Sequence, residues 1–118
     1  MIVLDTNILI DVLKYKIELD SLREFGEFIV LSTTKRELKN LSEKKSKDGM
    51  FAGLALQLIK NKKIKIAKTE GKTDASIVKY SKAHKCAVAT NDRELIKTLK
   101  MNGIKIIRIR QRKFFVYE

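Results

Sequence analysis

The chain has 118 residues and a mass of 13.6 kDa, a length that suits one domain over residues 1–118 with one hydrophobic core. It holds 26 lysine and arginine residues against 14 aspartate and glutamate residues, and the formal net charge of +12 indicates a polyanionic partner, nucleic acid before an anionic membrane surface. No apolar run approaches the roughly 18 residues of a membrane helix. The opening MIVLDTNILI lacks the basic segment of a signal peptide. One cysteine (Cys86) and one histidine (His84) exclude a disulfide framework and a zinc cluster, so we expect a soluble cytoplasmic protein with no membrane partner.

The hydrophobic pattern predicts short strands alternating with helices. In the first half we expect a strand at 2–4, a helix with apolar positions from 8 to 13, a helix at 18–25 closed by Gly26, a strand at 27–31, a helix capped by residues 32–34 that runs to about Lys45, a turn over 42–49 and a helix at 50–60. In the second half we expect a half-exposed strand at 64–66, a loop at 70–72, a helix at 73–82, a strand at 86–89, a helix opened by residues 90–92 and stopped by Asn102-Gly103, a strand at 104–109 and a basic, then aromatic, tail at 110–118 that forms another edge strand. This alternation is typical of an α/β fold with a mostly parallel sheet and helices on both of its faces.

Four acidic residues stand at the junctions where helices begin. Asp5 directly follows the first strand and Asp92 follows the strand at 86–89, while Glu37 and Asp74 lie in the first turns of two other helices. Ligands of open α/β sheets bind beyond the carboxyl ends of the strands. If the two strands are neighbours, Asp5 and Asp92 converge at that edge.

Each acid also has a purely structural interpretation. Asp5 is able to cap the first helix, Thr34 with Glu37 and Asn91 with Glu94 match the capping-box spacing, and acids in first turns suit the helix dipole. A cluster of four carboxylates, however, repels itself unless a cation is present. Hard oxygen ligands without histidine or cysteine suit Mg²⁺ or Mn²⁺.

These motifs together resemble a known family. The opening VLDTNIL, the acid Glu37 after the second strand, the segment TDASI at 73–77 and the segment ATNDREL at 89–95 resemble PIN-domain ribonucleases in order and spacing, over nearly the whole chain. The resemblance implies a three-layer α/β/α PIN fold. It implies that Asp5, Glu37, Asp74 and Asp92 are the metal-binding catalytic acids, and that Thr6, Asn7 and Thr90 are the polar residues that orient the acids or bind water.

The activity that the resemblance implies is hydrolysis of RNA phosphodiester bonds by a Mg²⁺- or Mn²⁺-dependent endonuclease, on single-stranded RNA and without a covalent enzyme intermediate. Water attack of this kind leaves 5′-phosphate and 3′-hydroxyl ends. The late segment and the arginine-rich strand after it are most similar to archaeal PIN proteins of ribosomal-RNA processing. The toxin ribonucleases of toxin–antitoxin modules share the same acids, so an antitoxin and a ribosome-assembly factor are alternative partners.

Two further classes stay open beside these. One is a non-catalytic RNA-binding or ribosome-assembly protein with a degenerate site, against which the presence of all four acids argues. The other is a receiver-like phosphoacceptor domain, which gathers aspartates and Mg²⁺ at strand ends but needs a paired acidic cluster after its first strand. This chain has a single Asp5 there, followed by Thr6 and Asn7.

The C-terminal segment carries a second candidate site. Arg108, Arg110 and Arg112 share one face if the whole segment is a strand, and with Lys113 they are candidates for RNA phosphate contacts. The aromatic residues at 114–117 are candidates for base stacking or for a homodimer contact. The competing interpretation is an edge strand protected by charge. Cys86 is expected to be an inert core thiol, and His84 to suit a helix C-terminus.

Overall fold

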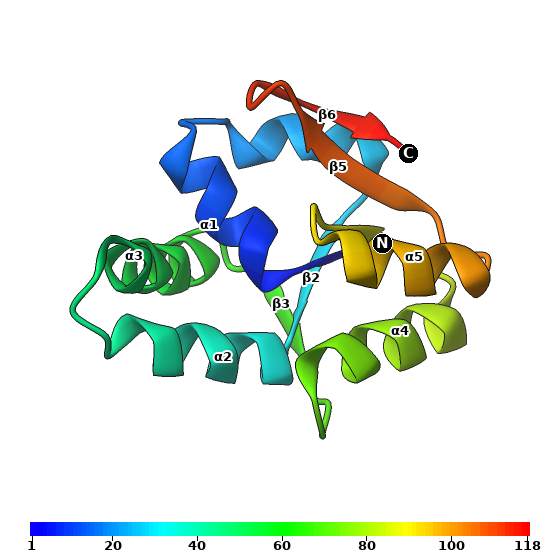
Figure 1. Cartoon of the computed structure of the whole chain (residues 1–118), viewed down its shortest axis with the longest axis horizontal. Helices are drawn as coiled ribbons and strands as arrows, with labels where there is room; N and C mark the ends of the chain where they lie inside the picture. The colour runs from blue at the N-terminus through cyan, green and yellow to red at the C-terminus, as the bar shows by residue number, and fades with distance from the viewer.

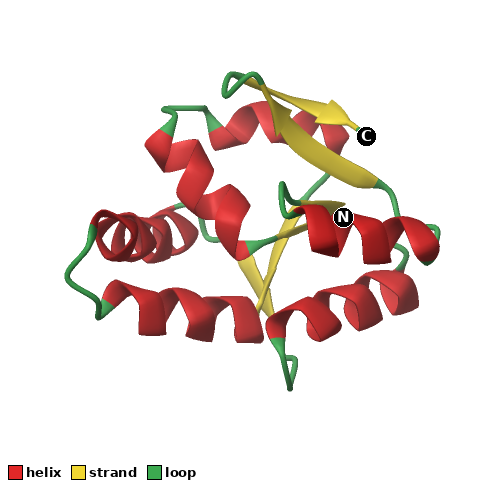
Figure 2. Cartoon of the chain, in the orientation of Figure 1, coloured by secondary structure: helices red, strands yellow, loops and turns green.

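The computed structural model describes all residues, 1–118, and contains one six-stranded sheet (Figure 2). The strands are β1 (Ile2–Leu4), β2 (Phe28–Leu31), β3 (Lys65–Ala67), β4 (Ala87–Ala89), β5 (Ile106–Arg110) and β6 (Phe114–Tyr117), in the spatial order β3-β2-β1-β4-β5-β6. All neighbours run parallel except β5 and β6, which are antiparallel. The predicted mostly parallel α/β sheet is therefore confirmed.

Helices cover both faces of this sheet, which gives the three-layer α/β/α arrangement (Figure 1). They are α1 (Thr6–Lys14), the 3₁₀ helix η1 (Leu19–Phe25), α2 (Ser32–Ser42), α3 (Lys47–Asn61), α4 (Thr73–His84) and α5 (Arg93–Met101). None of the helices combines the length and the apolar composition needed to cross a bilayer.

The side-chain alternation of the strands divides the core into two layers. On one face, Ile2 and Leu4 of β1 pack with residues of α1, η1 and α3. On the other face, Val3 packs with residues of α4 and α5. Because both faces are buried, the central strands read as continuous apolar runs, as parallel strands usually do.

Three helices differ from the sequence-based expectation. The helix expected to run from residues 32–34 to about Lys45 ends at Ser42. The segment at 18–25 is a 3₁₀ helix rather than an α-helix. The polar segment up to residue 49, predicted as a turn, contains the start of α3, which begins at Lys47 with Ser46 as its N-cap. Gly49 is required there, because a Cβ atom at this position would lie 2.1 Å from the carbonyl oxygen of Lys44. The glycine that suggested a turn thus permits the tight approach of a helix start.

The β5–β6 hairpin corrects the expectation for the arginines. Arg108 and Arg110 belong to β5, but Arg112 lies in the turn, where Gln111 and Arg112 both have φ near +55°. Successive positive φ values are the conformation of tight hairpin turns. The three arginines therefore do not share one strand face, although the predicted edge strand in the tail is confirmed as β6.

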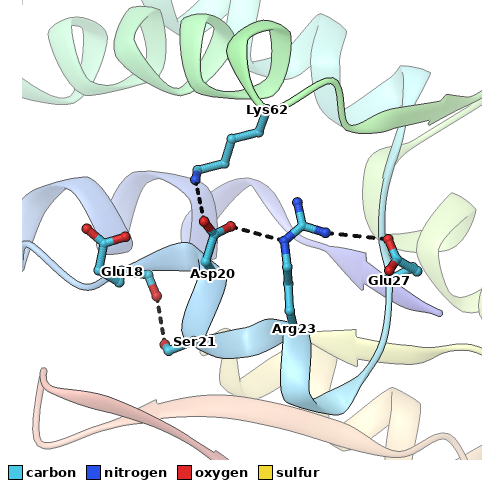
Figure 3. A network of polar contacts seen from close by, with 6 residues as sticks. All are labelled: Glu18, Asp20, Ser21, Arg23, Glu27 and Lys62. Carbon is cyan, nitrogen blue, oxygen red and sulfur yellow. Dashed lines mark hydrogen bonds and ion pairs between the residues drawn. The ribbon is translucent and has the colours of Figure 1, made fainter.

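Charged side chains tie η1 to the end of α3. Figure 3 shows Asp20 accepting hydrogen bonds from Lys62 Nζ (3.0 Å) and Arg23 Nε (3.1 Å), while Arg23 also pairs with Glu27 at 3.4 Å. We call these four residues the η1 network. Every acid of this network has at least one cationic partner.

Candidate active site

Strands β1 and β4 are parallel neighbours, and this pairing brings Asp5 and the Thr90–Asp92 segment to the same edge of the sheet. Leu4 is in register with Ala89, so the chain leaves both strands at the same level. The backbone N–H of Asp5 donates to the carbonyl of Ala89 at 3.1 Å. The carboxyl edge formed in this way is the position at which open α/β sheets bind their ligands.

Asp5 is a buried carboxylate, only 4% exposed. Its Oδ1 accepts a hydrogen bond from the backbone N–H of Thr6 (2.8 Å), which caps α1, and its Oδ2 accepts one from the hydroxyl of Thr90 (2.7 Å). Burial raises the pKa of Asp5 to about 6; the two hydrogen bonds act against this shift, and the nearby charges of Asp74 and Glu37 add to it. A carboxylate held this way favours a cation beside it at neutral pH.

Asp92 is linked to Asp5 through Thr90. The backbone N–H of Asp92 donates to Thr90 Oγ1 (3.1 Å), and the same hydroxyl donates to Asp5. Asp92 Oδ1 caps α5 by accepting from the N–H groups of Glu94 (2.9 Å) and Leu95 (3.2 Å). The predicted Asn91–Glu94 capping box is therefore wrong: Asp92 is the cap, and the amide of Asn91 instead bonds both backbone groups of Ile109.

Glu37 and Asp74 reach this edge from α2 and α4, whose first turns lie side by side in Figure 1 and contact each other. Both side chains are exposed and neither makes a hydrogen bond. Burial, then the charges of Asp92 and Glu37, raise the pKa of Asp74. Each of the four acids thus lies in the electrostatic field of at least one other, so the fold gathers negative charge at this edge.

No basic side chain neutralises this charge. The ion pairs of the chain involve other acids only: Asp20, Glu27, Asp48 and Glu118. The donor set, four carboxylates without histidine or cysteine, fits a hard divalent cation. No three of these side chains are grouped closely enough to hold one ion as they stand. We call Asp5, Glu37, Asp74 and Asp92 the carboxylate site.

The predicted supporting residues behave differently from one another. Thr90 bonds Asp5, as described above, whereas Thr6 contributes its backbone N–H and leaves its buried Oγ1 without a partner. Asn7 is exposed and makes no side-chain hydrogen bond. An orphaned buried hydroxyl is unusual in a folded protein, because the missing hydrogen bond costs free energy. Thr6 Oγ1 is one such atom beside Asp5.

The hydroxyl residues at 32–34 do not cap α2. The predicted Thr34–Glu37 capping box does not form either. The hydroxyls of Ser32 and Thr33 instead bond Thr69, which joins the start of α2 to the segment after β3. Thr34 Oγ1 is buried without a partner. Sequence reasoning missed this link because Thr69 is 36 residues away from Thr33.

The basic C-terminal residues are only partly free. Arg108 pairs with Glu118 (3.4 Å), and the guanidinium of Arg112 lies 5.1 Å from the centre of the Tyr15 ring. Arg110 and Lys113 are exposed and pair with no acid. Among the aromatic residues Phe115 is buried, while Tyr117 packs edge-on against Phe25.

This fold is that of a known family. The model of the family described as "PIN like domain" matches residues 2–112, and the chain belongs to that family. The chain is 39% identical to Ribonuclease VapC4 of Methanocaldococcus jannaschii, with 97% of this chain and 93% of the relative covered. It is 33% identical to Ribonuclease VapC9 of Archaeoglobus fulgidus, with 88% and 78% covered. The solved structure of the PIN domain endonuclease Utp24 superposes with a TM-score of 0.82, at 27% identity over 99% of this chain and 90% of that one.

Proposed function

We propose that this protein is a Mg²⁺- or Mn²⁺-dependent ribonuclease whose active centre is the carboxylate site. Four carboxylates that share one edge of the sheet without a basic partner, in a protein of net charge +12, carry the proposal. The relatives named above support the ribonuclease class, since two are named ribonucleases and one an endonuclease.

In this mechanism the chain positions its own oxygen atoms for catalysis. Asp5 would hold the cation most firmly, because Thr6 and Thr90 fix both of its oxygens and burial makes an uncompensated charge costly. Asp92, Glu37 and Asp74 would complete the ligand set, with Asp92 offering the oxygen that does not cap α5. A bound divalent cation supplies charge stabilisation at the phosphate and lowers the pKa of a water molecule. Hydrolysis by water predicts 5′-phosphate and 3′-hydroxyl products.

The biological setting that the relatives favour is that of a toxin ribonuclease of a toxin–antitoxin module, with RNA as substrate and an antitoxin as partner. Both curated relatives carry the name VapC, given to ribonucleases of such modules. A role in ribosomal-RNA processing, expected from the arginine-rich strand, has less support, because the name of the Utp24 structure states an endonuclease and no particular RNA.

The test of catalysis is Asp92→Asn, which removes one negative charge and retains the oxygen that caps α5. We expect the variant to melt within a few degrees of the wild type, to bind single-stranded RNA at least as tightly, and to lose cleavage in Mg²⁺ or Mn²⁺. Melting temperature, RNA affinity and cleavage of end-labelled RNA are measured on one preparation. Cleavage by the wild type that persists in excess chelator, or an Asp92→Asn variant that cuts at the wild-type rate, would overturn the proposal.

The C-terminal arginines are proposed to hold the RNA backbone. Arg110 and Arg112 are exposed and Arg108 is partly exposed in the β5–β6 hairpin, and arginine binds phosphate oxygens in a bidentate manner. Replacing all three by alanine should reduce the slope of log affinity against log salt by about 2, at roughly 0.7 per contact on single strands. A slope that does not change in the triple variant would place the RNA elsewhere on the surface.

A further inference from the structure

A groove with a volume of about 930 Å³ lies beside β3, which forms one edge of the sheet; β6 forms the other edge. One wall is α2, whose groove-facing residues recur along its whole length, and the rest is formed by the C-terminal part of α3 and by β3. We call it the lysine groove, because its lining includes Lys35, Arg36, Lys39, Lys60 and Lys63.

These five cations form an unbalanced positive surface. No aspartate or glutamate lines the groove, and none of the five takes part in an ion pair. Arg36 makes one polar contact, a 3.3 Å hydrogen bond to the carbonyl oxygen of Gly71. Like charges that face a common hollow without compensation favour an anionic occupant.

The floor of the groove is apolar. It includes Ile66, which is 37% exposed, and Leu56, which is partly exposed, above Ile59 and Ile64, which are buried. Strand β3 pairs with β2 alone, so its outer edge has no strand partner. A partly exposed apolar patch with a charged rim is typical of a protein-binding surface.

The composition of the groove distinguishes between two anionic occupants. Surfaces that bind single-stranded RNA combine cations with aromatic rings on which bases stack, and no aromatic residue lines this groove. A peptide with apolar residues on one side and carboxylates on the other matches both the floor and the rim. The wall α2 has 11 residues, about 16 Å of helix at 1.5 Å per residue, which is enough for a partner helix of roughly three turns.

We propose that the lysine groove is the docking site for an acidic amphipathic helix of a partner protein, with its apolar face on Leu56 and Ile66 and its carboxylates on the surrounding lysines. This inference does not depend on the proposed catalytic activity, because the groove shares no residue with the carboxylate site. The partner contributes a negatively charged helix, and the groove is distinct from the surface proposed to bind RNA.

The probe is a synthetic helical peptide of about 14 residues with leucines at i, i+3, i+4 and i+7 and glutamates on the opposite face. A peptide with the same composition in scrambled order, and a single-stranded RNA of about 12 nucleotides, are the comparison ligands. Affinities are measured by fluorescence anisotropy for three proteins: the wild type, the groove variant Lys35→Glu/Lys39→Glu/Lys60→Glu, and the matched control Lys44→Glu/Lys45→Glu/Lys47→Glu, which carries the same charge change on exposed residues outside the groove.

We expect the groove variant to lose at least tenfold in affinity for the amphipathic peptide and the matched control to lose less than threefold. Ile66→Ser, at a partly exposed position, should lower the affinity for the amphipathic peptide roughly three- to tenfold. Its melting temperature should stay close to that of the wild type. Equal binding of the scrambled peptide, or equal losses in the groove variant and its control, would overturn the proposal. A groove variant that loses the RNA and keeps the peptide would show that the groove binds nucleic acid instead.

Discussion

The acids of the η1 network and those of the carboxylate site show opposite electrostatics within one small molecule. In the network, hydrogen bonds from Lys62 and then Arg23 lower the pKa of Asp20 below its usual value (Figure 3). In the carboxylate site, burial and neighbouring acids raise the pKa values of Asp5 and Asp74. The chain has 12 more cations than acids, so a shortage of lysine or arginine does not explain the difference. The acids of the η1 network are paired with the chain's own cations, whereas the four acids of the carboxylate site have no such partner.

The largest expected contrast between the two regions is in catalysis. Asp74→Asn removes a carboxylate that makes no hydrogen bond and whose side chain is exposed. We expect its cleavage rate to fall by a factor on the order of 10³ or more, since metal-assisted attack is lost, with the melting temperature kept. The matched variant Asp20→Asn, in the η1 network, should cleave labelled RNA at the wild-type rate. Similar rates for the two variants would remove the distinction drawn between the regions.

The second contrast is the dependence of stability on pH. The pKa of Asp5 is about 6 in the folded protein and 3.8 in the unfolded reference. As pH rises, the unfolded state therefore loses this proton at a lower pH than the folded state does. The free energy of unfolding of the metal-free protein should therefore decrease as pH rises from about 4 through 6, by a few kcal/mol at about 1.4 kcal/mol per pKa unit.

Asp5→Asn should lack this loss, so its stability relative to the wild type should rise between pH 4 and 7 and then stay level. Urea unfolding in the presence of a chelator, at several pH values, measures the difference. Two curves that run parallel across this range would show that Asp5 does not titrate as described.

The third expectation concerns divalent cations. At neutral pH, Mn²⁺ should stabilise the wild type by about 3 kcal/mol when its concentration is roughly 100 times Kd. It should leave the double variant Asp5→Asn/Asp74→Asn unchanged, whereas Asp20→Asn should respond like the wild type. Urea unfolding with and without Mn²⁺, together with isothermal titration, provides the measurement. An equal response in the double variant would mean that the ion binds somewhere else.

The smallest effect is expected for the η1 network itself. The side chains of Asp20 and Arg23 are 51% and 40% exposed, and exposed ion pairs contribute roughly 0–1 kcal/mol. Asp20→Asn should lower the free energy of unfolding only slightly, and salt should reduce the difference. A loss of several kcal/mol would show that the network, despite its exposure, holds η1 against α3.

Local patterns in the sequence were sufficient for most elements and for the position of the acids. Short apolar runs predicted the strands, and Asp5 and Asp92 were expected at their carboxyl ends because a strand that stops at a polar residue exposes that residue at the sheet edge. The errors lie where two local signals are equivalent. Gly49 suits a turn and a tight helix start equally well, and either Asn91 or Asp92 is able to cap a helix. The contact with Lys44 and the bond to Thr90 decide these cases.

What the sequence alone determined was the α/β class, the order of strands and helices, and which acids stand at helix starts, because these depend on residues close together in the chain. Only the tertiary structure decided how each charge is used. It buries Asp5 against Thr90, 85 residues away, and thereby raises the pKa of Asp5. It pairs Arg108 with Glu118 in an antiparallel hairpin. It also collects the cations of the lysine groove from α2, from the end of α3 and from the segment between α3 and β3. Desolvation and Coulomb interactions depend on distance in space, and no local pattern of residue types specifies that distance.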